Sequence, residues 1–193
     1  MPISMSHAPI PDWLPCNVYI DGQYVRTELR NAQQNDAFDP LRLAHHILAN
    51  KEAKGVYGRP LALSRVFYYD ATDESSANSQ AQEQYLSRVN RLPDTHVETG
   101  FVRQGRGKRR EQKAVDVKLA VAALEAAFFR GVGAIIIVAG DADFTPVSEA
   151  IRRAGPHVIV VAFEQHLSPE LRNSADRVLF LPEPPDDLYT PLA

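Results

Sequence analysis

The sequence predicts an α/β domain in which a mainly parallel β-sheet is covered by helices on both faces. Apolar segments of strand length alternate with segments of helical periodicity, and most connections between them are short. This alternation is typical of βαβ units, whose strands run parallel. The run that begins at Ile135 is apolar and rich in β-branched residues, as in a central strand that is buried on both faces.

The elements expected in the first half of the chain follow from apolar spacing and from turn residues. Asp39 can cap a helix that starts at Pro40. Pro93 ends a later, polar helix near residue 91. In order, we expect a strand at 17–20, a helix at 23–31, a helix at 40–51, a strand at 63–69, a polar helix that follows residues 73–79 and ends near residue 91, and a strand at 95–104.

The second half continues the same alternation. Gly105 and Gly107 indicate a loop, Thr145 before Pro146 is a candidate helix cap, and Gly155 before Pro156 ends that helix. We expect an Ala-rich helix at 114–130, the buried strand from Ile135, a helix at 145–154, a strand at 157–163, a short helix at 169–173 and a strand at 177–181.

Length and composition indicate one domain. The 193 residues, 45% of them hydrophobic, suffice for one sizeable core, which we place at residues 16–181. Residues 1–15 are rich in proline and are expected to form an extended lead-in. Residues 182–193 are rich in proline and acids, and we expect a poorly ordered tail there.

Several classes of protein are disfavoured. No segment approaches the roughly 20 apolar residues of a membrane span, and the start of the chain does not resemble a secretory signal. The single cysteine, Cys16, cannot form an internal disulfide, so a cytoplasmic location is expected. No G-x-G-x-x-G follows the first strand and no Walker lysine loop is present, so no nucleotide cofactor is expected.

Four aspartates stand where a ligand site is expected in such a sheet. Asp21 follows the first strand, Asp116 lies near the start of the Ala-rich helix, and Asp141 and Asp143 follow the buried strand. If the first strand and the Ile135 strand are neighbours where the winding reverses, their carboxyl ends meet. Carboxylates held this close repel one another unless a cation neutralises them. Their oxygens suit hard cations such as Mg²⁺ or Mn²⁺.

Each aspartate also has a purely structural interpretation. Asp21-Gly22 can be an ordinary turn, Asp116 can favour the positive end of its helix, and Asp143 can cap the following helix, although Thr145 is the better candidate cap. The combination of all four favours a site over these separate explanations.

A basic segment directly precedes Asp116. Six basic residues and two glycines lie within eleven positions, and the basic residues are Arg103, Arg106, Lys108, Arg109, Arg110 and Lys113. Arginine forks and lysine charges at this place suit a phosphodiester backbone, whereas the alternative is a solvated loop. No aromatic residue alternates with these basic residues, so base stacking would need others, such as Tyr24, Tyr57 or Phe144.

Three blocks of the sequence resemble NYN-domain proteins of the LabA-like group, within the PIN-like nuclease superfamily. They are Val-Tyr-Ile-Asp-Gly at 18–22, Lys-Ala-Val-Asp-Val-Lys-Leu-Ala-Val at 113–121 and Ala-Gly-Asp-Ala-Asp-Phe at 139–144. The resemblance implies a three-layer α/β/α sandwich of PIN-like, Rossmann-like topology. It also implies metal-dependent endoribonuclease activity, in which the four aspartates bind Mg²⁺ or Mn²⁺ and RNA is the substrate. A homodimer is compatible with this family type, but the sequence does not specify its surface.

Two positions depart from the family pattern. Tyr24 stands where the family commonly has Asn, and Ala122 stands where many relatives carry a second helix Asp. These changes favour an alternative function, a catalytically weakened protein that binds RNA or regulates a partner. A third interpretation, a haloacid-dehalogenase-like phosphatase, fails at Gln23, where that chemistry needs a second acid.

Overall fold

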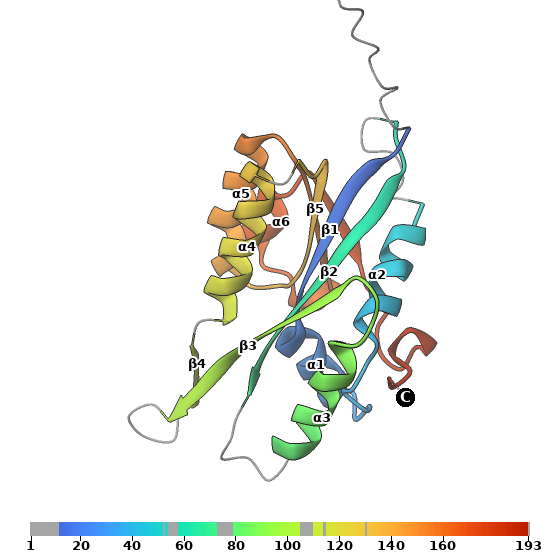
Figure 1. The fold of residues 1–193 in the computed structure, drawn as a ribbon, viewed down its shortest axis with the longest axis vertical. Coiled ribbons are helices and arrows are strands. Elements are labelled where there is room, and N and C mark those ends of the chain that lie inside the picture. Colours follow the sequence, from blue (N-terminus) through green and yellow to red (C-terminus); the bar gives the residue numbers. More distant parts are fainter. Residues whose placement is uncertain are drawn as a thin grey trace, which may run out of the picture.

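The computed structural model describes residues 12–51, 53, 58–72, 79–104, 110–113, 115–129 and 131–192 (Figure 1). The side chains of residues 72, 101–104 and 110–113 are not part of this description. Most of the predicted lead-in, residues 1–11, therefore lies outside the described residues, as do Tyr57, Arg106, Lys108 and Arg109.

A seven-stranded sheet forms the centre of the fold, in the order β4-β3-β2-β1-β5-β6-β7. All neighbouring strands run parallel except β4, which pairs antiparallel with β3 at one edge. This confirms the predicted, mainly parallel sheet. The strands are β1 (Leu14–Asp21), β2 (Leu61–Thr72), β3 (Thr95–Gln104), β4 (Arg110–Lys113), β5 (Ala134–Val138), β6 (His157–Ala162) and β7 (Arg177–Phe180).

Helices cover both faces of the sheet, which gives the three layers that the resemblance implies (Figure 1). One layer holds α1 (Gly22–Asn31), α2 (Pro40–Ala49) and α3 (Ser79–Val89), and the other holds α4 (Val115–Phe129), α5 (Thr145–Ala154) and α6 (Pro169–Ser174). Within the described ranges, none of the helices is long and apolar enough to cross a membrane.

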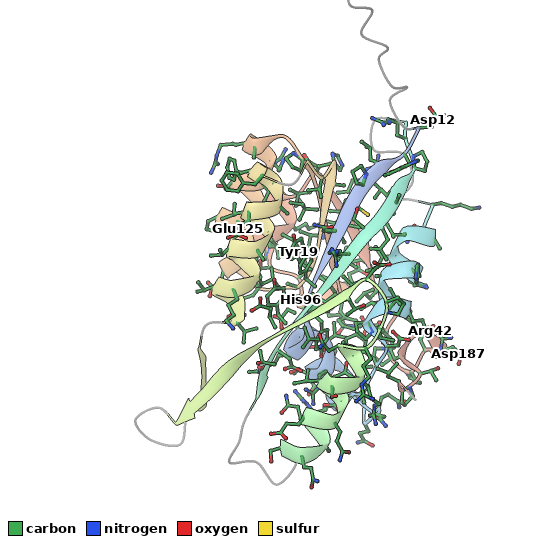
Figure 2. All side chains as sticks on the ribbon, viewed as in Figure 1. Asp12, Tyr19, Arg42, His96, Glu125 and Asp187 are labelled. Atoms are coloured by element: carbon green, nitrogen blue, oxygen red, sulfur yellow. The ribbon has the colours of Figure 1, made fainter. Side chains whose placement is uncertain are left out.

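The continuous apolar runs of the central strands are explained by burial on both faces. In β5, Ile136 and Val138 belong to the core beneath α1 and α2, whereas Ile135 and Ile137 belong to the core beneath α4 and α5. All five residues of β5 are fully buried. Figure 2 shows side chains filling the space between the sheet and both helical layers, with Tyr19 of β1 on the α4 side.

One predicted cap is wrong. Thr145 is already helical, because a short 3₁₀ turn, η1 (Ala142–Phe144), runs directly into α5. The cap position falls on Phe144, which provides no side-chain hydrogen bond. Asp141 instead caps η1, since its carboxylate accepts a hydrogen bond from the backbone N–H of Asp143 at 3.0 Å. The predicted cap at Asp39 is confirmed, with Leu41 N–H donating to its carboxylate at 2.9 Å.

The expectation of a poorly ordered tail is also wrong. Residues 182–192 include another short 3₁₀ turn, η3 (Asp187–Tyr189), whose Leu188 and Tyr189 are buried. The Tyr189 hydroxyl donates to the carbonyl of Pro182 at 2.8 Å, and Pro191 forms a bridge with Phe38. The tail packs because two apolar side chains follow its prolines and acids, and these reach the core beneath α2.

Candidate acidic site

The candidate site lies where the winding of the sheet reverses. β1 pairs in parallel with β2 on one side and with β5 on the other, so Ile20 lies opposite Val138 and the carboxyl ends of β1 and β5 meet. The prediction that these two strands are neighbours is confirmed. Ligands of open α/β sheets bind at such a switch point.

An acidic pocket of about 290 Å³ opens at this point. Three of the four predicted aspartates reach it from three different elements: Asp21 from the end of β1, Asp116 from the first turn of α4 and Asp141 from the loop after β5. Asp143 is exposed on the adjacent turn η1. The residues that line the pocket are Asp21, Gln23, Tyr24, Thr27, Glu28, Asp116, Asp141 and Phe144.

The Asp-Gly motif at the end of β1 has a local structural cause. Asp21 caps α1, because its carboxylate accepts a hydrogen bond from Tyr24 N–H at 3.0 Å. Gly22 packs against the ring of Tyr68, and a Cβ atom at this position would overlap that ring. The motif therefore turns the chain sharply into α1 and holds the Asp21 carboxyl at the pocket.

The loop after β5 is fixed by a second close approach. A Cβ atom at Gly140 would overlap the carbonyl oxygen of His166 and approach the ring of Tyr24. Ser168 N–H donates to the carbonyl of Gly140 at 2.9 Å. The connection between β6 and α6 therefore lies directly against the loop that carries Asp141.

The electrostatics of the pocket are those of crowded carboxylates. Burial, with smaller contributions from the charges of Asp116 and Asp70, raises the pKa of Asp21 to about 7, even though Tyr24 N–H donates to its carboxylate. Partial burial, Asp141 and Asp143 raise the pKa of Asp116. Asp116 therefore interacts electrostatically with all three other aspartates, so negative charge accumulates at the pocket.

These donors fit a hard divalent cation only in an open arrangement. Among the described residues, no three His, Cys, Asp or Glu side chains gather closely enough to hold a metal ion by themselves. Mg²⁺ commonly binds proteins through one or two carboxylates and keeps several waters or substrate phosphates. Oxygen donors and mutual repulsion at Asp21, Asp116 and Asp141 fit such a partly hydrated ion, although they do not build a closed cage.

Glu28 belongs to the pocket wall and His166 contacts it, and neither residue was predicted. The Glu28 side chain, only 13% exposed, lines the pocket, and its Oε2 lies 2.9 Å from Nδ1 of His166. Glu28 follows Tyr24 by one helical turn, so the helical spacing of α1 could have indicated it. His166 lies in the turn η2 (Glu164–His166) after β6, and only the tertiary fold brings it here.

Arg26 and Asp70 form a buried ion pair close enough to Asp21 that Asp70 contributes to its raised pKa. Arg26 Nη1 lies 2.6 Å from Oδ2 of Asp70, which is 2% exposed and also accepts a hydrogen bond from the Tyr68 hydroxyl at 3.2 Å. Arg26 bonds Asp36 as well, at 3.0 Å. The sequence does not indicate this network, because its members come from α1, β2 and the loop before α2.

The two departures from the family pattern have different surroundings. Tyr24 lines the pocket, and its hydroxyl accepts a hydrogen bond from Phe163 N–H at 2.8 Å and donates to the carbonyl of His166 at 3.4 Å. Burial raises the pKa of this phenol, so it stays neutral. Ala122 packs against the apolar core beneath α4, and its carbonyl accepts a hydrogen bond from the Tyr19 hydroxyl.

The basic segment is partly described. β3 and β4 pair antiparallel, with Arg103 opposite Glu111 and Gln104 opposite Arg110, and β4 ends at Lys113 just before α4. The backbone therefore places Lys113 three residues before Asp116. Of the aromatic residues considered for base stacking, Phe144 is only 2% exposed, so it offers no free ring face.

A three-layer α/β/α fold with aspartates at the switch point of its parallel sheet is consistent with a PIN-like domain. The chain belongs to the NYN domain family, whose sequence model matches residues 15–182, and NYN domains are part of the PIN-like nuclease superfamily. The family assignment is therefore confirmed, whereas the finer assignment to the LabA-like group stays a prediction.

Two relatives extend this comparison. An uncharacterized protein of Methanocaldococcus jannaschii is 29% identical over 126 residues, which are 64% of this chain and 52% of the relative. The chain thus spans about half the length of this curated relative. A crystal structure of a protein of unknown function from Vibrio parahaemolyticus has a TM-score of 0.65 at 21% identity, covering 94% of this chain and 99% of that one. This likeness concerns the fold alone.

Proposed function

We propose that the acidic pocket is the centre of a metal-dependent ribonuclease that hydrolyses RNA phosphodiester bonds. The observation that carries the proposal is the convergence of Asp21, Asp116 and Asp141, from three elements, on one pocket at the β1–β5 switch point. Membership of a nuclease superfamily supports the same reaction class.

Asp21, Asp116 and Asp141 would hold the cation, with Asp143 beside them. A bound Mg²⁺ or Mn²⁺ supplies positive charge that stabilises the phosphate in the transition state and makes water a stronger acid. The carboxylates accept hydrogen bonds from water and so orient it toward the phosphorus. The basic segment, with Arg103, Arg106, Lys108, Arg109, Arg110 and Lys113, holds the phosphodiester backbone beside the pocket.

A second candidate, RNA binding without cleavage, is favoured by one observation. Tyr24 occupies the pocket wall with a neutral phenol whose oxygen is already bonded to Phe163 and His166. Such a phenol is a poorer ligand for a hard cation than an amide or a carboxylate. In this alternative the basic segment still binds RNA, but the pocket fails to activate water.

The test is incubation of the purified protein with labelled single-stranded RNA in Mn²⁺, Mg²⁺ or EDTA. Asp141→Asn removes one carboxylate of the pocket, and Asp187→Asn makes the same change at an exposed position in the tail. We expect metal-dependent cleavage by the wild type and by Asp187→Asn, and a loss on the order of 100-fold or more in Asp141→Asn.

RNA binding, measured by fluorescence anisotropy in EDTA, separates the two candidates. RNA that is bound but uncut in either metal would support the non-catalytic alternative. RNA that is neither bound nor cut would contradict both candidates. Equal cleavage by the two variants would mean that the activity comes from elsewhere.

A further inference from the structure

The side of α4 that faces away from the sheet is apolar. Val117 is 64% exposed, Val121 48% and Phe128 60%, and Leu124 lies partly buried between them. These residues are separated by four, three and four positions, which is the a/d spacing of a heptad seam. They therefore form one continuous stripe, which we call the α4 seam.

The opposite side of α4 is already used. Leu119, Ala123 and Ala126 are fully buried and pack onto the sheet. A surface helix of a single domain normally has one apolar side and one polar side, whereas α4 is apolar on two opposite sides. Figure 1 shows α4 in the same layer as α5 and α6. In the described part of the chain, the seam thus stays largely open to solvent.

The charges beside the seam indicate which partner fits it. Lys118 and Glu125, seven residues apart, occupy one flank, whereas Ala120 and Ala127 occupy the other. When two helices pair antiparallel about a twofold axis, each flank of one helix faces the same flank of the other helix, which runs in the opposite direction. Lys118 of one copy then faces Glu125 of the other, twice, while the alanine flanks let the helices approach closely.

A parallel pairing would not give this match. Each charged flank would then face an alanine flank, and neither Lys118 nor Glu125 would gain an opposite charge. Lys118 bonds the carbonyl of Thr99 at 2.8 Å and lies 3.3 Å from Glu98, yet 43% of its side chain is exposed. Figure 2 places Glu125 on α4 at the margin of the molecule in this view, and its side chain is exposed.

We propose that the α4 seam is a homodimer interface, in which two copies of this chain pair their α4 helices antiparallel. The surface is self-complementary in shape and in charge, as a twofold interface requires. A single pair of 15-residue helices buries less area than a typical stable dimer, so the association is weak and depends on concentration. This inference is independent of the proposed nuclease activity.

The test is sedimentation equilibrium over a range of about 1 to 500 μM, which brackets a micromolar dissociation constant. We expect the average mass to rise from the monomer value of 21.5 kDa toward twice that value. Val121→Glu places a charge in the seam and should weaken association by at least about tenfold. Trp13→Ser is the matched control, because Trp13 is equally exposed, at 48%, but lies outside α4.

A charge exchange tests the antiparallel arrangement itself. Glu125→Lys places two lysines opposite each other across the interface and should weaken association several-fold. Adding Lys118→Glu restores the opposite charges and should bring the dissociation constant back to within about threefold of the wild type. Circular dichroism checks that every variant is folded.

A wild type that stays monomeric over the whole range would overturn the proposal. So would a dimer that Val121→Glu leaves unchanged, because the interface would then lie elsewhere. Association that Val121→Glu weakens, but that Glu125→Lys leaves unchanged or Lys118→Glu fails to restore in the Glu125→Lys background, would overturn the antiparallel pairing.

Discussion

Asp21 combines a favourable contact with a charge that the fold disfavours. Its carboxylate caps α1, but burial and neighbouring carboxylates raise its pKa to about 7, far above the ordinary value of 3.8. Between these two pH values the folded protein binds more protons than the unfolded chain. The free energy of unfolding therefore falls as the pH rises through this window, as far as Asp21 is concerned.

The first prediction follows from replacing Asp21 by Asn. Asparagine caps helices as well as aspartate does, so the hydrogen bond to Tyr24 N–H is kept and only the charge is lost. In EDTA, we expect Asp21→Asn to be more stable than the wild type at pH 8, by on the order of 2 kcal/mol. The difference should become small near pH 4, where the Asp21 carboxyl is protonated in the folded protein and about half protonated in the unfolded chain.

Urea denaturation at pH 4, 6 and 8 measures this difference, with Asp187→Asn as an exposed control. A stability difference that is the same at every pH would mean that the Asp21 carboxyl does not titrate in this window. Adding Mg²⁺ or Mn²⁺ at pH 8 should then stabilise the wild type more than Asp21→Asn, because a bound ion offsets the repulsion that the variant lacks.

The aspartates of the pocket could be predicted because their positions follow from local sequence. Each comes directly after an apolar run or in the first turn of a helix, and parallel strands bring such positions to one edge. Glu28 could have been indicated by its position one helical turn after Tyr24, whereas His166 and the Arg26–Asp70 pair could not be predicted from local sequence. Their contacts join segments that are distant in the chain, and their immediate neighbours in the sequence carry no signal of the partner.

At the scale of elements, the connection between β6 and α6 determines the position of the Asp141 loop. Gly140 allows the carbonyl of His166 to lie against this loop, and Tyr24 bonds the same connection at Phe163 and His166. Glu28 adds a fourth contact through His166. These contacts therefore hold α1, the Asp141 loop and this connection together around the pocket.

The second prediction concerns Gly140→Ala. The new Cβ would overlap the His166 carbonyl, so either the connection or Asp141 must shift. We expect a loss of about 2 to 3 kcal/mol in the free energy of unfolding, together with reduced cleavage of RNA. Ala142→Ser adds one atom to the same loop at a partly exposed position and should have little effect. Equal behaviour of the two variants in urea denaturation would contradict this account of the loop.

Some elements could be predicted and others could not, for identifiable reasons. Long periodic segments such as α4 and α5 were found close to their observed bounds. β4 was missed, because its four residues, Arg-Glu-Gln-Lys, have no apolar pattern and read as part of a basic loop. The predicted cap at Thr145 was wrong, because the residue pair Thr145-Pro146 does not show that a 3₁₀ turn already precedes the helix.

For the whole molecule, the layered architecture and the switch point were predictable, since both follow from the alternation of strands and helices. The packing of the tail was not. Proline and acidic residues dominate the composition of residues 182–193, and composition alone predicts disorder. The tail packs nevertheless, because the side chains of Leu188 and Tyr189 are buried against the core beneath α2.

The last prediction concerns Tyr189, which connects the tail to the pocket wall through Phe163. The ring of Tyr189 contacts the ring of Phe163, with centroids 6.1 Å apart, and Phe163 N–H is the donor to Tyr24 in the pocket wall. Tyr189→Ala leaves a cavity at this contact and removes the hydrogen bond to Pro182, so we expect it to cost about 3 to 4 kcal/mol.

Asp187→Ala is the matched control for this change, because its side chain is exposed in the same turn and should alter stability by less than about 0.5 kcal/mol. Urea denaturation of both variants measures the two costs. If Tyr189→Ala had the same free energy of unfolding as the wild type, the tail would not be packed against Phe163 in solution. The hydrogen bonds of Tyr24 would then hold it without help from the tail. A large loss would instead show that the tail is packed onto the domain through Tyr189, whose ring contacts the residue that donates to Tyr24 in the pocket wall.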